Sequence, residues 1–165
     1  KVSSYTRSGI NSAMTKGKLV GNYANSILAK REATAAGYEE AIMLDGQGYV
    51  AEASGENIFV IKRGKVATPP IGGSILAGIT RATVIELCAE LGLALEERTI
   101  SRDELYIADE VFFTGTAAEV TPVREIDDRT LGDGSRGPIT KRIQERYFQL
   151  VRGPELVHPE WLSFV

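Results

Sequence analysis

The sequence is poor in the residue types that build cross-linked or metal-bound scaffolds, with one cysteine, one histidine and one tryptophan in 165 residues. A single cysteine excludes a disulfide within the chain. Cys88 lies in an apolar helical pattern, which is typical of core packing in a reducing compartment. We therefore expect a cytoplasmic protein. His158 has no cysteine or histidine near it in the sequence, so we expect no metal site.

Long apolar runs and an excess of basic residues are also absent. No run approaches the length that crosses a bilayer, and the start of the chain lacks a signal-peptide pattern, so we expect no membrane partner. The 19 lysines and arginines are outnumbered by 22 aspartates and glutamates, which argues against nucleic acid as a partner. The hydrophobic content of 43% is ordinary for a globular domain with a real core.

Extended and amphipathic segments follow one another along the chain and predict one mixed α/β or α+β domain. The expected strands are 1–7, 40–45, 49–53, 57–62, 66–68, 93–100, 110–113 and 118–126. The expected helices are 22–36 with Asn22 as N-cap, 79–91 ended by Gly92, 101–108 opened by a capping box of Ser101 and Glu104, and 138–151 with Gly153 beyond its end.

Lys18 lies shortly before Gly21-Asn22-Tyr23, separated from it by Leu19 and Val20, and the first expected helix follows. A lysine between a loop and a helix is held by rigid backbone on both sides. If it is also shielded from water, the pKa of its ammonium falls and the neutral amine becomes a usable nucleophile or base. This stretch taken alone is more typical of a solvated surface lysine.

Three further segments carry polar groups at places where chemistry is possible. Glu52 lies on an expected strand among small apolar neighbours, where a carboxylate must be exposed or paired with a buried cation. Gly78-Ile79-Thr80-Arg81 opens a helix and offers free backbone N–H groups to an anion, although Thr80 can equally be a plain N-cap. Thr114-Gly115-Thr116 places two hydroxyl groups at a strand end.

Read together, the motifs of this chain resemble those of the branched-chain amino-acid aminotransferases, which are fold-type IV pyridoxal-phosphate enzymes. The motifs are Lys18-x-x-Gly21-Asn22-Tyr23, Glu52-Ala-Ser-Gly-Glu-Asn-Ile-Phe59, Leu76-Ala-Gly-Ile-Thr-Arg81, Ser101-Arg-Asp-Glu-Leu-Tyr106, Ala108-Asp-Glu-Val-Phe-Phe113, Gly115-Thr-Ala-Ala-Glu-Val-Thr-Pro-Val123 and Gly137-Pro-Ile-Thr-Lys141. The resemblance runs from about Arg7 to Phe148. It is specific because the motifs fall in the family's order and spacing.

The resemblance implies the large C-terminal domain of the D-amino-acid aminotransferase-like fold. Residues 1–10 are then an interdomain connector and residues 11–165 the cofactor-binding domain, with the N-terminal lobe absent from this chain. The implied activity is pyridoxal 5'-phosphate-dependent transfer of the amino group between branched-chain L-amino acids (Leu, Ile, Val) and 2-oxoglutarate by a ping-pong mechanism. This belongs to branched-chain amino-acid biosynthesis, and we expect a homo-oligomer.

The resemblance also assigns roles residue by residue. Lys18 binds the cofactor aldehyde covalently and moves the α-proton of the substrate; Lys16 is the rival amine, but the spacing to Gly21-Asn22-Tyr23 selects Lys18. Tyr23 donates a hydrogen bond to the phenolic oxygen, and Glu52 keeps the pyridine nitrogen protonated, which favours the carbanion. The other implied contacts are Leu76 with the ring, Ile79, Thr80, Gly115 and Thr116 with the phosphate, and Thr116 and Ala117 with the substrate carboxylate.

This sequence departs from the family pattern in the loop Ala13-Met-Thr-Lys-Gly17 before Lys18, where the family pattern predicts a proline and a shorter loop with fewer basic residues. The arginine that the family's N-terminal lobe offers to the phosphate is also missing. Arg81 is the only arginine near the expected phosphate site, and we expect it to point outward. We further expect an exposed apolar patch beside Lys18 and Glu52, where the lobe packs.

Three other functions fit parts of the pattern. D-amino-acid transaminase and aminodeoxychorismate lyase share the fold type, but the segment Gly115–Val123 is the branched-chain version. A non-catalytic scaffold domain is the alternative from a different class of function. It is disfavoured because Lys18, Tyr23, Glu52 and Thr116 are retained together.

Overall fold

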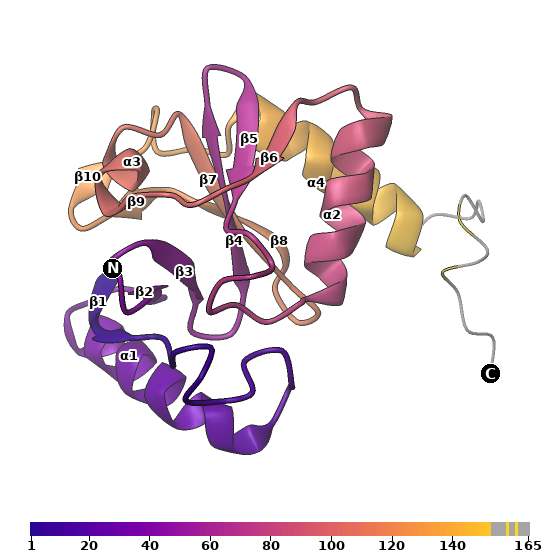
Figure 1. Cartoon of the computed structure of the whole chain (residues 1–165). Helices are drawn as coiled ribbons and strands as arrows, with labels where there is room; N and C mark the ends of the chain where they lie inside the picture. The colour runs from indigo at the N-terminus through magenta and orange to yellow at the C-terminus, as the bar shows by residue number, and fades with distance from the viewer. Residues whose placement is uncertain (153–157, 159–160, 162–165) are drawn as a thin grey trace.

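Two β-sheets stacked between helices make up the fold, so that four layers follow one another (Figure 1). The structure is a computed structural model, and it describes residues 1–152, His158 and Trp161. One helix covers the outer face of a small sheet, and two helices cover the outer face of a larger one. The inner faces of the two sheets pack against each other. The architecture confirms the expected mixed α/β class.

The small sheet has the order β1 (Val2–Thr6), β2 (Ile42–Leu44), β3 (Val50–Ala53). Strands β1 and β2 are parallel and are connected through helix α1 (Tyr23–Ala35), whereas β2 and β3 form an antiparallel hairpin. The buried face of α1 consists of the small residues Ser26, Ala29 and Ala33, so the helix lies close to the sheet.

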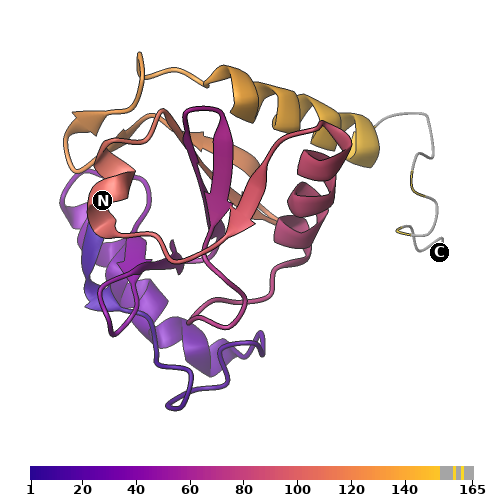
Figure 2. The same ribbon diagram turned by 45° about the horizontal axis from the view of Figure 1, so that its top comes forward.

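The larger sheet has the order β6 (Leu95–Glu97), β5 (Lys65–Thr68), β4 (Asn57–Lys62), β7 (Glu110–Gly115), β8 (Glu119–Val123), and Figure 2 shows it from a second direction. Strand β4 is antiparallel to both of its neighbours, β5 and β7. A short ribbon of β9 (Glu125–Ile126) and β10 (Arg129–Thr130) closes the edge of the molecule near β1.

Side chains on the larger sheet alternate between two cores, as the two-residue period of a strand requires. Phe59 and Phe112 stack with ring centroids 4.9 Å apart and face helices α2 (Ile79–Glu90) and α4 (Pro138–Arg152). Ile58 and Phe113 face the small sheet instead. Burial on both faces explains why β4 and β7 are almost continuously apolar in sequence.

Most of the expected helices and their ends are confirmed. Helix α3 (Arg102–Tyr106) begins with the expected capping box of Ser101 and Glu104. Gly37 and Gly92 follow α1 and α2 with φ of 86° and 65°, a conformation that glycine adopts without steric cost. Helix α4 begins at Pro138 as expected, while Gly153 lies outside the described residues.

Two expectations about local structure are only partly confirmed. Asn22 occupies the N-cap position of α1, but its side chain makes no capping hydrogen bond, because a short 3₁₀ turn (Val20–Asn22) runs straight into α1 and gives Asn22 helical φ and ψ of −70° and −15°. Its side-chain amide donates to the carbonyl groups of Met14 and Gly17 instead. The strand expected over 93–100 is only Leu95–Glu97, because its partner β5 ends at Thr68.

Candidate active site

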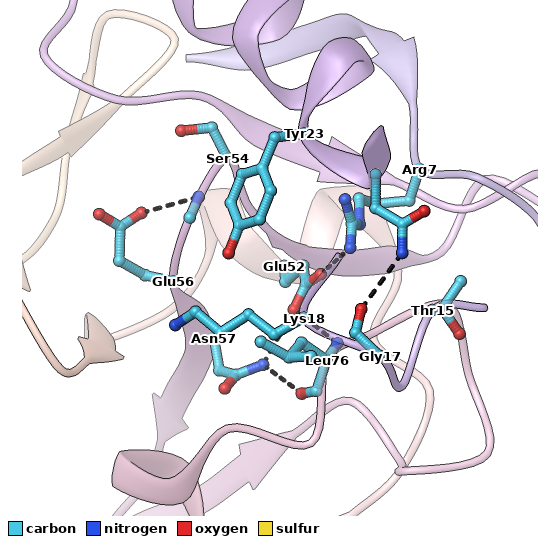
Figure 3. A pocket seen from close by; sticks show the side chains of 12 residues that line it. Arg7, Thr15, Gly17, Lys18, Tyr23, Glu52, Ser54, Glu56, Asn57 and Leu76 are labelled. Carbon is cyan, nitrogen blue, oxygen red and sulfur yellow. Dashed lines mark hydrogen bonds and ion pairs between the residues drawn. The ribbon is translucent and has the colours of Figure 1, made fainter. Parts of the chain in front are cut away.

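The expected site residues gather where strands of both sheets end beside two loops, 7–19 and 69–78. Figure 3 shows the first of two adjoining cavities there. Its wall is formed by Arg7, Thr15, Gly17, Lys18, Asn22, Tyr23, Glu52, Ser54, Gly55, Glu56, Asn57 and Leu76. Three residues that the sequence assigned to one site, Lys18, Tyr23 and Glu52, therefore share a cavity.

Glu52 is a buried side chain of this cavity, with only 5% of its surface exposed. Its Oε1 lies 2.5 Å from Nη2 of Arg7, which is itself buried. Its Oε2 accepts hydrogen bonds from Nδ2 of Asn57 at 2.9 Å and from the backbone N–H of Leu76 at 3.0 Å. Of the two alternatives that the sequence left open, exposure or pairing with a buried cation, the structure has the second.

Opposing effects set the ionisation of Glu52. Burial disfavours the carboxylate and raises the pKa of Glu52 to about 7, while the positive charge of Arg7 and the donor from Leu76 limit the rise. Burial alone therefore favours the protonated form, and the ion pair with Arg7 favours the carboxylate. Strongly perturbed carboxyl groups of this kind are concentrated at functional sites.

Lys18 and Tyr23 reach the same cavity from the loop before α1 and from the first turn of α1. Figure 3 shows the Tyr23 hydroxyl directed into the cavity. The side chain of Lys18 is exposed, and within the described residues its amine makes no hydrogen bond or ion pair. The shielding that would activate this lysine is thus not supplied by the described part of the chain.

Lys16, the rival amine, is engaged elsewhere. Its Nζ donates to the carbonyl groups of Gly73 and Ile75, the latter at 2.9 Å, and so ties loop 7–19 to loop 69–78. Burial lowers the pKa of Lys16, which taken alone favours a neutral amine. The two carbonyl acceptors require N–H donors, so Lys16 acts as a clamp between the loops rather than as a free nucleophile.

A second cavity adjoins the first and shares Lys18, Gly55, Asn57 and Leu76 with it. The remaining wall is formed by Lys16, Ala77, Gly78, Ile79, Thr80, Thr114, Gly115 and Thr116. The start of α2 and the end of β7 therefore meet at one depression that Lys18 borders. The expected phosphate residues Ile79, Thr80, Gly115 and Thr116 all line it.

The second cavity is rich in hydrogen-bond donors. Helix α2 begins at Ile79, and the N–H groups of its first turn have no helical acceptor. Thr114 is 1% exposed, and its hydroxyl has no hydrogen-bond partner among the described residues. The positive end of a helix beside free donors favours an anion.

Ala117 lies in the exposed turn after Thr116, outside the residues that line the two cavities, and its contact with the substrate carboxylate stays a prediction. One expectation about this region is wrong. Arg81 does not point outward: it is 4% exposed, and its Nη2 contacts the Pro69 carbonyl at 3.0 Å and Glu97 at 2.5 Å. The carboxylate of Glu97 draws it inward, because a buried guanidinium needs a counter-charge.

Arg7 and Asn57 are site residues that sequence reasoning did not single out. The need of Glu52 for a cation was visible in the sequence, but nothing marked which arginine would supply it. Asn57 is the first residue of β4; the sequence placed it in a strand and in the motif Glu52–Phe59 but gave it no role of its own. Its amide connects Glu52 to the carbonyl of Leu76 at 3.0 Å, a contact between segments far apart in sequence.

The segment around Lys18 exposes several large apolar side chains. Ile10, Met14, Leu19 and Val20 are 64%, 69%, 51% and 89% exposed. No helix in the described part of the chain is long and apolar enough to cross a membrane. Residues 1–152, His158 and Trp161 contain no cluster of His, Cys, Asp and Glu that could hold a metal ion.

Comparison with known families assigns the class of protein. Residues 2–126 match the amino-transferase class IV family, and the chain belongs to that family. It is 54% identical over its whole length to the branched-chain-amino-acid aminotransferase of Pseudomonas aeruginosa, and 58% identical over 99% of its length to the probable enzyme of that name from Aquifex aeolicus.

A solved structure of an enzyme of this name is also similar over nearly the whole chain. A branched-chain amino acid aminotransferase from T.th., complexed with N-(5'-phosphopyridoxyl)-L-glutamate, is 47% identical and matches 99% of this chain with a TM-score of 0.94. The chain spans about half the length of these relatives, 53% of both curated proteins and 55% of the solved chain.

Gly78 is expected to be essential for the position of Asn57. A Cβ atom at residue 78 would overlap Oδ1 of Asn57, whose amide holds Glu52. We predict that Gly78→Ala lowers the free energy of unfolding by about 1–3 kcal/mol, measured by urea denaturation. Gly21→Ala is the matched control, since nothing lies within 4 Å of its added Cβ, and it should be nearly neutral. Equal stability of both variants would contradict the proposed contact.

Proposed function

We propose that this chain is the cofactor-binding part of a pyridoxal 5'-phosphate-dependent branched-chain aminotransferase. It would exchange the amino group between Leu, Ile or Val and 2-oxoglutarate by a ping-pong mechanism. One observation carries the proposal: of two adjoining cavities, the first contains a buried carboxylate, the second contains free donors, and Lys18 borders both.

The residues present fit this cofactor. Its ring nitrogen and its dianionic phosphate lie at different positions of the molecule; the protonated nitrogen needs a carboxylate partner, and the phosphate needs a set of hydrogen-bond donors. Glu52, paired with Arg7, supplies the carboxylate, and the first turn of α2 with Thr114 and Thr116 supplies the donors. When bound, the cofactor supplies an aldehyde for the substrate's amino group and a ring that withdraws electrons from the α-carbon.

Lys18 carries the proton transfer in this proposal. Its amine has no competing partner in the described structure and borders both cavities. Once water is excluded from its surroundings, the pKa of its ammonium falls and the neutral amine can accept the α-proton of the substrate and return it. Lys16 remains bound to two carbonyl groups and takes no part in the transfer.

Tyr23 and Glu52 orient and polarise the ring. The Tyr23 hydroxyl, directed into the first cavity, would donate to the phenolic oxygen. Glu52 would hold the proton at the ring nitrogen, and Leu76, beside it, would pack against the ring. A positive charge kept at this nitrogen stabilises negative charge that develops at the substrate's α-carbon.

The phosphate would be bound by Ile79, Thr80, Gly115 and Thr116, since all four line the second cavity. Thr116 and Ala117 would contact the substrate carboxylate from the turn after β7. The branched-chain substrates rest on the names of the relatives, and the glutamate adduct in the solved relative supports 2-oxoglutarate as the acceptor.

The chain would work together with an N-terminal lobe, with residues 1–10 as connector and 11–165 as the cofactor-binding C-terminal domain. The half-length coverage of its relatives and the exposed side chains of Ile10, Met14, Leu19 and Val20 support this. The lobe would exclude water from Lys18 and supply an arginine to the phosphate. We also propose a cytoplasmic homo-oligomer, in which the buried thiol of Cys88 stays reduced.

Lys18→Ala should abolish transamination while leaving the fold intact, because it removes both the covalent anchor and the proton carrier. The measurement is turnover with leucine and 2-oxoglutarate, together with the site of cofactor attachment after borohydride reduction, located by peptide mass. Lys16→Ala is the control and should retain attachment at Lys18. Near-normal turnover of the Lys18 variant would show that the assignment is wrong.

Glu52→Gln should leave the cofactor bound but lower turnover by at least about two orders of magnitude, or about 3 kcal/mol in the barrier. A neutral amide does not hold the ring nitrogen protonated. Glu56→Gln changes another carboxylate of the same cavity and should cost less than about tenfold. An unchanged rate in the Glu52 variant would exclude the proposed role.

The proposed lobe gives an expectation for affinity. Residues 1–165 alone should bind pyridoxal 5'-phosphate far more weakly than a polypeptide in which the N-terminal lobe precedes them, because an uncovered ring and an incompletely paired dianion remain in contact with water. Titration calorimetry of the two proteins measures the difference. Equal affinity, with full activity of residues 1–165 alone, would refute the need for a lobe.

A further inference from the structure

Arg7 is a buried charge next to the proposed site whose role the assignments above leave open. It is 9% exposed, and its guanidinium reaches three different elements. Nη2 lies 2.5 Å from Oε1 of Glu52 on β3, and Nη1 donates to Oγ of Ser26 on α1 at 3.0 Å. Nε makes a longer contact, 3.5 Å, with the carbonyl of Ser74 in loop 69–78.

The backbone of Arg7 is fixed as well. Its N–H donates to the carbonyl of Leu44 at 2.8 Å, which continues the pairing of β1 with β2. The guanidinium is therefore held between the small sheet, its covering helix and the loop before α2. A planar group with donors fixed in a fork transmits this rigidity to the carboxylate that it binds.

We propose that Arg7 is a positioning residue of the reaction, which keeps Glu52 ionised and fixes its carboxylate at the wall of the cavity. The inference rests on the proposed function, because it concerns the ability of Glu52 to retain a proton at a cofactor nitrogen. Arg7 itself acts through Glu52 and needs no contact with cofactor or substrate.

The charges around Glu52 support this role. Burial raises the pKa of Glu52, and Arg7 is the largest effect that opposes it, ahead of the more distant Lys16. Lys18, Tyr23 and Glu56 are the other titratable groups of the same cavity. Without Arg7, only weaker effects would oppose burial, and the pKa of Glu52 would rise further, towards the protonated form. A neutral carboxylic acid does not favour a positive ring nitrogen, just as a neutral amide does not.

The test measures the ionisation of Glu52 directly, in the protein without cofactor. Glutamate side chains labelled with ¹³C at Cδ are titrated by NMR, and the Glu52 signal is assigned by its loss in Glu52→Gln. Arg7→Gln should raise the midpoint of this titration by at least one pH unit, whereas Arg7→Lys, which keeps the charge, should raise it less. Ser26→Ala retains both members of the ion pair and provides a milder variant if the Arg7 variants do not fold.

Turnover of the same variants with cofactor completes the test. Arg7→Gln should lower kcat at pH 7.5 by at least tenfold with a much smaller change in KM, and Arg7→Lys should recover part of the loss. An unchanged Glu52 midpoint in Arg7→Gln, whatever its turnover, would overturn the proposal, as would a raised midpoint with unchanged kcat. Failure of the proposed function itself is distinguishable, because it would show as retained activity in Lys18→Ala and leaves the cofactor-free titration untouched.

Discussion

The buried ion pair of Arg7 and Glu52 is the contact on which the rest of the site depends. Two charges removed from water cost several kcal/mol each, and the cost is offset only if every remaining donor and acceptor is paired. The structure meets this condition with Asn57 and the N–H of Leu76 on one side and Ser26 on the other. The pair therefore orders a strand, a helix and a loop around one carboxylate.

The two-sheet architecture explains why a site exists at this place. The end of β3, the start of β4 and the end of β7 meet at this place. Strands β4 and β7 are fixed by cores on both faces of the larger sheet, and β3 packs into the core between the two sheets. The loops 7–19 and 69–78 can then carry reactive groups, because the strands that they connect to are held by the cores. Lys16 bridges the two loops through its hydrogen bonds. This extra basic residue before Lys18, which departs from the expected family pattern, therefore has a structural function here.

Local patterns in the sequence predicted the elements, because apolar periodicity records which faces are buried. The capping box at Ser101 was predictable for the same reason, since all its partners lie within four residues. Arg7 was not predictable as the partner of Glu52, because the contact joins positions 45 residues apart and depends on how β1 pairs with β2. The burial of Arg81 was likewise not predictable, because its counter-charge, Glu97, lies on a different element. Tertiary contacts of this kind leave no periodic signal.

The parallel pairing of β1 with β2 has a consequence for the order of events during folding. Parallel strands cannot be joined by a tight turn, and here the chain must first close the long loop through α1, residues 7–41, before the two strands meet. Long-range pairings of this type form slowly. Arg7 therefore meets its counter-charge only when this loop has closed, so the carboxylate of Glu52 is fixed by long-range structure and not by its own hairpin.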